Sequence, residues 1–89
     1  MAVINSIEFQ IAKGSESTAE EMLKSPQGLP FTRSQKGCQR LEMSADLEDP
    51  NRIFLTEVWD SKDDFDAYFA IRGKEIEEGG FFSKFVPLL

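Results

Sequence analysis

The chain has 89 residues, which is enough for one domain near the lower size limit for an independent hydrophobic core. Its net charge of −6 argues against nucleic acid and anionic membrane surfaces as partners, because both attract clusters of Lys and Arg. The absence of His excludes Ser-His-Asp triads, Cys-His pairs, His-based metal sites and haem held by an axial His. A single Cys and an N-terminus without a signal-peptide pattern predict a cytoplasmic protein, and no apolar run is long enough to span a membrane.

The first predicted element is a strand over residues 2–12. Apolar and polar residues alternate there, with Ile7 and Phe9 on one face and Ile4 on the other. Asn5 shares the face of Ile7 and is therefore a polar residue in an otherwise apolar row.

A helix should follow, capped by Ser15 or Ser17 and rich in Ala, Glu, Met and Leu. It should end near Ser25, because two Pro and one Gly occur within residues 26–30. Residues 31–36 are expected to form an irregular or single-turn connection back to the sheet.

Residues 38–47 predict a second strand, whose inward-facing residues are Leu41, Met43, Ala45 and Leu47. The sequence Asp49-Pro50-Asn51 predicts the turn to a third strand over residues 53–59. That strand is apolar on both faces, so it should be covered on both sides.

The second long helix should begin after Ser61, which is a suitable N-cap, and end at the glycine pair 79–80. The aspartates at its start match the positive end of the helix dipole, and they lack the spacing of a calcium loop. We therefore predict no metal site. The last segment, 81–89, has aromatic residues at helical spacing, which favours a short helix; a fourth strand remains the alternative.

Three segments carry a resemblance to a known family. They are Glu57-x-Trp59-x-Ser61 followed by the aromatic Phe65, the sequence GCQRLE at 37–42, and the turn EDPNR at 48–52. Together they lie within residues 36–72 and resemble the antibiotic biosynthesis monooxygenase family of small dimeric α/β-barrel proteins.

The resemblance and the element order predict an α+β, ferredoxin-like fold for residues 1–89, with an antiparallel sheet and two helices on one face. A helical C-terminal segment would replace the fourth strand and leave the sheet incomplete or completed by a partner. The resemblance implies a cofactor-independent monooxygenase that oxidises a small phenolic or polyketide-like aromatic to a quinone. Many family members carry a His where this chain has Tyr68, and a second where it has Gly73.

The candidate catalytic residues are Asn5, Tyr68 and Arg72. The Tyr hydroxyl can bind a ligand oxygen, and the Arg can neutralise a phenolate; alternatively the Tyr is a core residue and the Arg pairs with Glu57 or Glu75. An Asn on the first strand orients a substrate oxygen in some family members, and capping of a strand end is the alternative.

The candidate substrate-binding residues are Trp59, Glu57, Phe65 and Phe69. Trp59 offers a flat wall for an aromatic ligand or is simply a core residue. Glu57 can act as a base if it is buried, and an internal ion pair is the alternative.

Two further functions stay open beside the monooxygenase, namely a small-ligand-binding dimer without catalysis and a structural dimer whose pocket its own Phe side chains fill. In each case we predict a homodimer through the sheet face that carries Phe54, Val58 and Ile4, because these side chains would otherwise lie in water.

Overall fold

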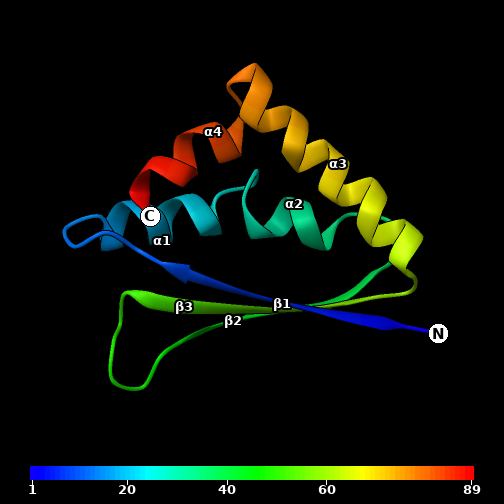
Figure 1. Cartoon of the computed structure of the whole chain (residues 1–89), viewed down its shortest axis with the longest axis horizontal. Helices are drawn as coiled ribbons and strands as arrows, with labels where there is room; N and C mark the ends of the chain where they lie inside the picture. The colour runs from blue at the N-terminus through cyan, green and yellow to red at the C-terminus, as the bar shows by residue number, and fades with distance from the viewer.

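The computed structural model describes residues 1–89 and contains one antiparallel sheet. Its strands are β1 (Val3–Gln10), β2 (Cys38–Ala45) and β3 (Arg52–Trp59), in the spatial order β1-β3-β2. All helices lie on one side of this sheet (Figure 1). The predicted ferredoxin-like α+β fold is confirmed.

Four helices form the second layer: α1 (Glu16–Lys24), α2 (Leu29–Arg33), α3 (Lys62–Glu78) and α4 (Phe81–Phe85), followed by a 3-10 turn, η1 (Val86–Leu88). The two long predicted helices are α1 and α3. The preference for a short C-terminal helix is also confirmed, and the last segment adds no strand to the sheet. None of the helices is both long and apolar enough to cross a bilayer.

Helix α2 begins earlier than predicted, at Leu29, and contains Pro30. Proline is tolerated in the first turn of a helix, because the amide it lacks would have no intrahelical partner there. Pro30 therefore lies in the first turn of a helix instead of only separating two elements. Gly28 precedes it at a close approach, where an added Cβ would lie 2.4 Å from the carbonyl oxygen of Met22.

The ends of α3 lie where the sequence places them. The Ser61 side chain accepts a hydrogen bond from the Asp64 amide, and Gly79 ends the helix with a positive φ of 81°. Both features depend only on neighbouring residues, which explains why the prediction is accurate.

The strand register fixes which residues face the helices. Asn5 pairs with Glu57 and Ile4 with Val58, so these two pairs lie on opposite faces of the sheet. Strand β2 is irregular between Cys38 and Arg40, and it ends at Ala45. Leu47 was predicted to face inward and is instead 99% exposed, because the chain has already left the strand for the turn.

The core lies between the sheet and the helices. Its buried side chains include Leu41 and Leu55 from the sheet and Leu23 from α1. Helix α4 adds Phe85, whose ring stacks on Phe81 at 5.8 Å. The aromatic residues of the C-terminal segment thus fill the space between layers.

Candidate functional site

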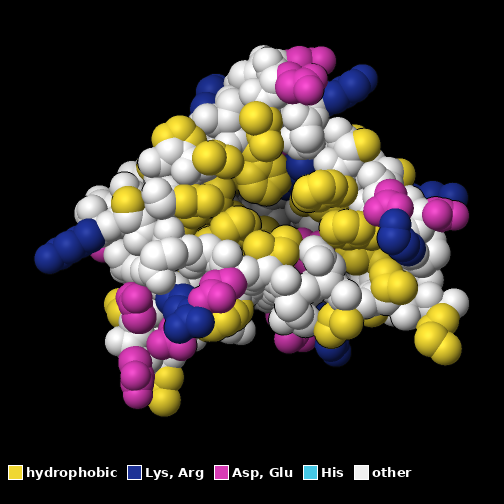
Figure 2. Space-filling view, in the orientation of Figure 1, with side chains coloured by type: hydrophobic (Ala, Val, Ile, Leu, Met, Phe, Trp, Pro, Cys, Tyr) yellow, Lys and Arg dark blue, Asp and Glu magenta, His cyan; other side chains and the backbone are white.

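A hollow opens between α3, α4 and the sheet, and Figure 2 shows that hydrophobic side chains line most of it. At this place lies a cavity of about 50 Å³. Its only charged lining residues are Glu57 and Arg72. The other lining residues are mainly aromatic or aliphatic and come from all parts of the fold: Ile7, Phe9, Leu23, Gly28, Leu29, Thr32, Leu55, Phe65, Tyr68, Phe69, Phe81 and Phe82.

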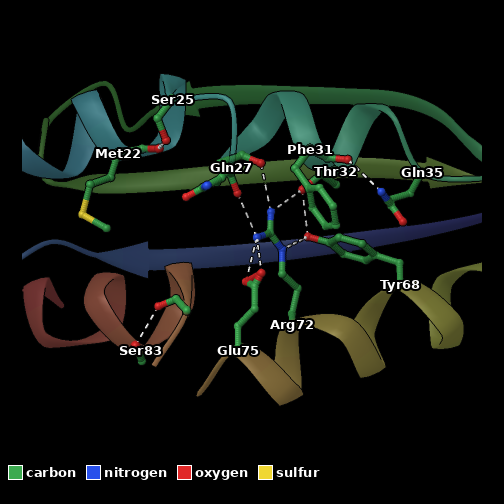
Figure 3. Close-up of polar contacts among 12 residues, drawn as sticks. Met22, Ser25, Gln27, Phe31, Thr32, Gln35, Tyr68, Arg72, Glu75 and Ser83 are labelled. Atoms are coloured by element: carbon green, nitrogen blue, oxygen red, sulfur yellow. Dashed lines mark hydrogen bonds and ion pairs between the residues drawn. The ribbon is translucent and has the colours of Figure 1, made fainter. Parts of the chain in front are cut away.

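Arg72 projects from α3 toward α2 and holds the helix layer together (Figure 3). Its Nη1 donates to the Gln27 carbonyl at 3.0 Å and to the Glu75 carboxylate at 2.9 Å. Its Nη2 donates to the Gly28 carbonyl at 2.9 Å.

The same guanidinium reaches two hydroxyl groups. Nε donates to the Tyr68 oxygen at 2.8 Å, and Nη2 donates to Thr32 Oγ1 at 3.0 Å. The two hydroxyls are themselves 2.8 Å apart, which closes a ring of three hydrogen bonds. With these contacts, each of the five N–H groups of the guanidinium has a protein acceptor.

Arg72 is only 3% exposed and lies among aromatic rings. Its guanidinium carbon is 4.8 Å from the centre of Phe82 and 4.9 Å from that of Phe31. Such contacts are favourable for a desolvated cation. The buried charge is thus compensated by Glu75, by carbonyls and by rings.

Tyr68 is buried beside this arginine. Burial raises the pKa of its hydroxyl, and the hydrogen bonds with Thr32 and Arg72 oppose that shift only in part. The phenol therefore stays protonated at neutral pH and can donate a hydrogen bond.

Glu57 lies on the sheet side of the cavity and is 2% exposed. Its Oε1 accepts from the Trp59 indole at 3.0 Å and from the Asn5 amide at 3.4 Å. No Lys or Arg pairs with it; the predicted alternative of an ion pair at Glu57 is wrong, and Arg72 pairs with Glu75 instead. Asn5 lies within β1 and contacts this carboxylate, so it does not cap a strand end.

Trp59 has no exposed surface. Tyr68 stacks on its ring at 5.0 Å, and Phe65 meets it edge-on at 5.9 Å. The indole is thus a core group that does not line the cavity. Phe65 stacks on Phe69, which is 61% exposed and lies at the border between cavity and solvent.

The cavity is smaller than a typical ligand site, which encloses about 300–1,000 Å³. A larger groove of about 410 Å³ lies between α1 and the end of the β2–β3 hairpin, with Ala19, Met43 and Ile53 in its walls. That groove contains none of the predicted site residues. The smaller cavity is the better candidate because it combines buried aromatic walls with buried polar groups.

Thr32 is the site residue that sequence reasoning missed. It is 1% exposed and bonds to both Tyr68 and Arg72. The one available signal was its spacing of three residues from Leu29, which places both on the buried face of α2.

Comparisons with known proteins agree with this architecture. Residues 2–71 match the sequence model of the family described as antibiotic biosynthesis monooxygenase. No curated protein matches the chain.

Three solved structures are similar over nearly all of the chain. A conserved protein from Methanosarcina mazei Go1 has a TM-score of 0.81 at 20% identity, covering 100% of this chain and 82% of that one. A proposed antibiotic biosynthesis monooxygenase from Deinococcus radiodurans has a TM-score of 0.75 at 19% identity, with coverages of 99% and 80%. Another from Chloroflexus aurantiacus has a TM-score of 0.74 at 20% identity, with coverages of 99% and 81%. At these identities the likeness concerns the fold.

Proposed function

Because this chain belongs to the antibiotic biosynthesis monooxygenase family, we propose that it is a monooxygenase that oxidises a small phenolic aromatic compound without a bound cofactor. The observation that carries the proposal is the cavity between the layers. There the buried carboxylate of Glu57 and the buried hydroxyl of Tyr68 border the same aromatic-lined space. This combination suits a flat substrate with polar edges.

The reaction needs no redox group from the protein, because the substrate supplies the electrons. Loss of the phenol proton places negative charge on a ring carbon, and dioxygen adds there. One oxygen atom remains on the ring, the other leaves as water, and the product is a quinone. The protein's part is to bind the ring, exclude water and hold the phenolate in a fixed polar environment.

The predicted site residues divide into two groups under this proposal. Tyr68 and Arg72 form the polar wall on the helix side, where Arg72 holds the hydroxyl of Tyr68 in place through a hydrogen bond. Asn5 and Trp59 hold Glu57 from the sheet side. Phe65 and Phe69 contact the ring of the substrate at the mouth of the cavity.

A ring system needs more room than about 50 Å³. We propose that the substrate enters by displacing Phe69, because this side chain is 61% exposed and has little packing to lose. The deeper part of the cavity then receives the oxygen-bearing edge of the substrate. Replacing Phe69 by Ala should widen this path and lower KM for larger aromatics.

A second function is favoured by the same small volume. The phenylalanines of α3 and α4 fill much of the space between the layers, as expected for a ligand-binding or structural dimer without catalysis. Turnover separates these functions. The protein should convert naphthols to quinones, or hydroquinones to hydroxyquinones, with one labelled oxygen atom from ¹⁸O₂ in the product, and it should not do so under argon. No conversion of any member of such a panel would favour the non-catalytic dimer.

The proposed assembly is a homodimer through the sheet face opposite the helices. Ile4 is 66% exposed on this face and pairs with Val58, and Phe54 lies further along β3. Covering an apolar side chain of this size contributes about 1.5–3 kcal/mol. Replacing Phe54 by Glu should therefore give a monomer in sedimentation, whereas replacing the exposed Leu47 by Glu should not. An unchanged dimer in the Phe54 variant would contradict this interface.

A further inference from the structure

The two carboxylate oxygens of Glu57 are used unequally. Both hydrogen bonds, from Asn5 and from Trp59, go to Oε1, and no protein group donates to Oε2. Every fully buried side-chain oxygen or nitrogen in the structure has a hydrogen-bond partner. Oε2 must therefore retain contact with a water-sized space, and the cavity that Glu57 lines provides it.

The orientation of this free oxygen is fixed from the sheet. Asn5 lies directly across from Glu57 in the β1–β3 register, and Trp59 is two residues further along the same strand. Because both donors hold Oε1, the carboxylate cannot rotate without losing two hydrogen bonds. An oxygen that borders the cavity, is held in place and has no hydrogen-bond partner is an unused acceptor.

The opposite wall offers an unused donor. Thr32 and Tyr68 carry one hydroxyl proton each, and each hydroxyl already accepts a bond from Arg72. The contact between the two hydroxyls uses one of these protons. The other proton has no partner in the protein, and both residues line the cavity.

The charges of the two walls also differ. The guanidinium of Arg72 is matched by Glu75, which accepts from it at 2.9 and 3.1 Å. Glu57 has no such cation beside it. When a substrate proton moves onto Glu57, the carboxylate becomes neutral and the substrate becomes negative. The net charge of the cavity therefore stays unchanged.

We propose that Glu57 Oε2 is the base that removes the substrate's hydroxyl proton, and that the Thr32–Tyr68 pair donates a hydrogen bond to a second oxygen of the same molecule. The substrate O–H bond breaks, an O–H bond forms at Oε2, and the electron pair stays on the substrate oxygen. This inference rests on the proposed function and narrows its substrate class to aromatics with two oxygen substituents, one of them a hydroxyl.

The first test replaces Glu57 by Gln, which keeps an oxygen that can accept from Trp59 and Asn5 but cannot take a proton. With hydroquinone under oxygen, kcat should fall by about 10²–10⁴-fold, the usual contribution of a general base. Binding of the non-reacting probe 4-nitrophenol under argon, and the melting temperature, should stay close to those of the wild type. An unchanged kcat, or a loss of binding that equals the loss of rate, would overturn the assignment of a base.

Chemical rescue gives a readout that a structural role would not move. Replacing Glu57 by Ala leaves space at the cavity for formate, which can accept the proton instead. The rate of this variant should rise with formate concentration, while the Gln variant, whose side chain still fills the space, should not respond. No response in either variant would contradict the assignment.

The second test concerns the donor. Replacing Thr32 by Val and Tyr68 by Phe together removes both hydroxyl protons, so this double variant should lose the preference for 4-nitrophenol over phenol. Either single replacement leaves one hydroxyl proton without a protein acceptor and should keep this preference. Thr18 to Val, on the exposed surface of α1, is the matched control and should change nothing. A preference retained in the double variant would overturn the two-oxygen recognition.

These tests separate the inference from the function on which it rests. The protein could bind 4-nitrophenol preferentially and turn over no substrate. That result would contradict the monooxygenase proposal and the role of Glu57 as its base, while the recognition of two substrate oxygens would stand. If the Gln variant of Glu57 retains turnover, the monooxygenase proposal stands and only the assignment of Glu57 as the base is contradicted. If the protein neither binds 4-nitrophenol nor turns over any substrate, both the proposed function and this inference are contradicted.

Discussion

Two polar clusters border the same small cavity, one built from the helices and one from the sheet. In the helix cluster, each N–H of the Arg72 guanidinium has an acceptor within the protein. In the sheet cluster, Glu57 uses one oxygen and leaves the other free. Both are buried to a similar degree, so burial alone does not distinguish them. Hydrogen-bonding capacity does, because a saturated group holds structure while an unsaturated one can still bind a ligand.

The largest effect should come from the saturated cluster. Replacing Arg72 by Met leaves the Glu75 carboxylate, two carbonyls and two hydroxyls without their donor, and it should lower the free energy of unfolding by about 3–5 kcal/mol. The Gln variant of Glu57 should change it by no more than about 1 kcal/mol, because the amide oxygen replaces Oε1. Urea denaturation measures both.

Replacing Arg40 by Met is the control for loss of a positive charge. Its side chain is 60% exposed and pairs only with Glu42, so the expected cost is about 0–1 kcal/mol. Equal costs for the Arg72 and Glu57 variants would remove the distinction between the two clusters.

Gly28 supplies a carbonyl to the saturated cluster at a place where the backbone is tightly packed. An alanine Cβ would lie 2.4 Å from the Met22 oxygen and 2.5 Å from the Leu23 oxygen. Both are backbone carbonyl oxygens, which cannot move aside as the end of a flexible side chain could. Replacement by Ala should cost about 1–3 kcal/mol. Gly73 in α3 has no atom within 4 Å of an added Cβ, so the same replacement there should stabilise the protein by about 0.5–1 kcal/mol. A harmless Gly28 variant would show that α2 moves easily.

The smallest effect concerns alkaline pH. Burial raises the pKa of Tyr68 above its ordinary value of about 10. The folded state thus binds this proton more tightly than the unfolded state does, and the associated stability is fully present below about pH 10 and is lost as pH rises further. The Phe variant should have lower stability at neutral pH and a shallower decline above pH 10. Parallel declines for the two proteins would exclude Tyr68 as a source of alkaline sensitivity.

The parts of the fold that the sequence predicts well are those that depend on local pattern. The strand Arg52–Trp59, the Ser61 cap and the Gly79 end all follow from neighbouring residues. Thr32 could not be found this way, because its importance depends on Tyr68, which is 36 residues away. The pairing of Asn5 with Glu57 depends on a strand register that spans 52 residues.

The predicted site residues illustrate the same limit. Alternation along β3 correctly places Glu57 and Trp59 on the inner face, yet it does not say that the indole donates to the carboxylate two residues before it. Helical spacing likewise brings Tyr68 and Arg72 together, but the carbonyls of Gln27 and Gly28 come from a segment that only the folded chain brings close.

The pairing of Asn5 with Glu57 also bears on the order of folding. Strands β2 and β3 are joined by a short turn, so their hairpin can form early, whereas β1 must close a loop of about 40 or more residues before it pairs with β3. We expect β1 to dock late, so Glu57 would remain hydrated during most of the folding reaction. Replacing Asn5 by Ala should then speed unfolding more than it slows folding, which stopped-flow measurements can test. The carboxylate would lose its water only when the last strand arrives.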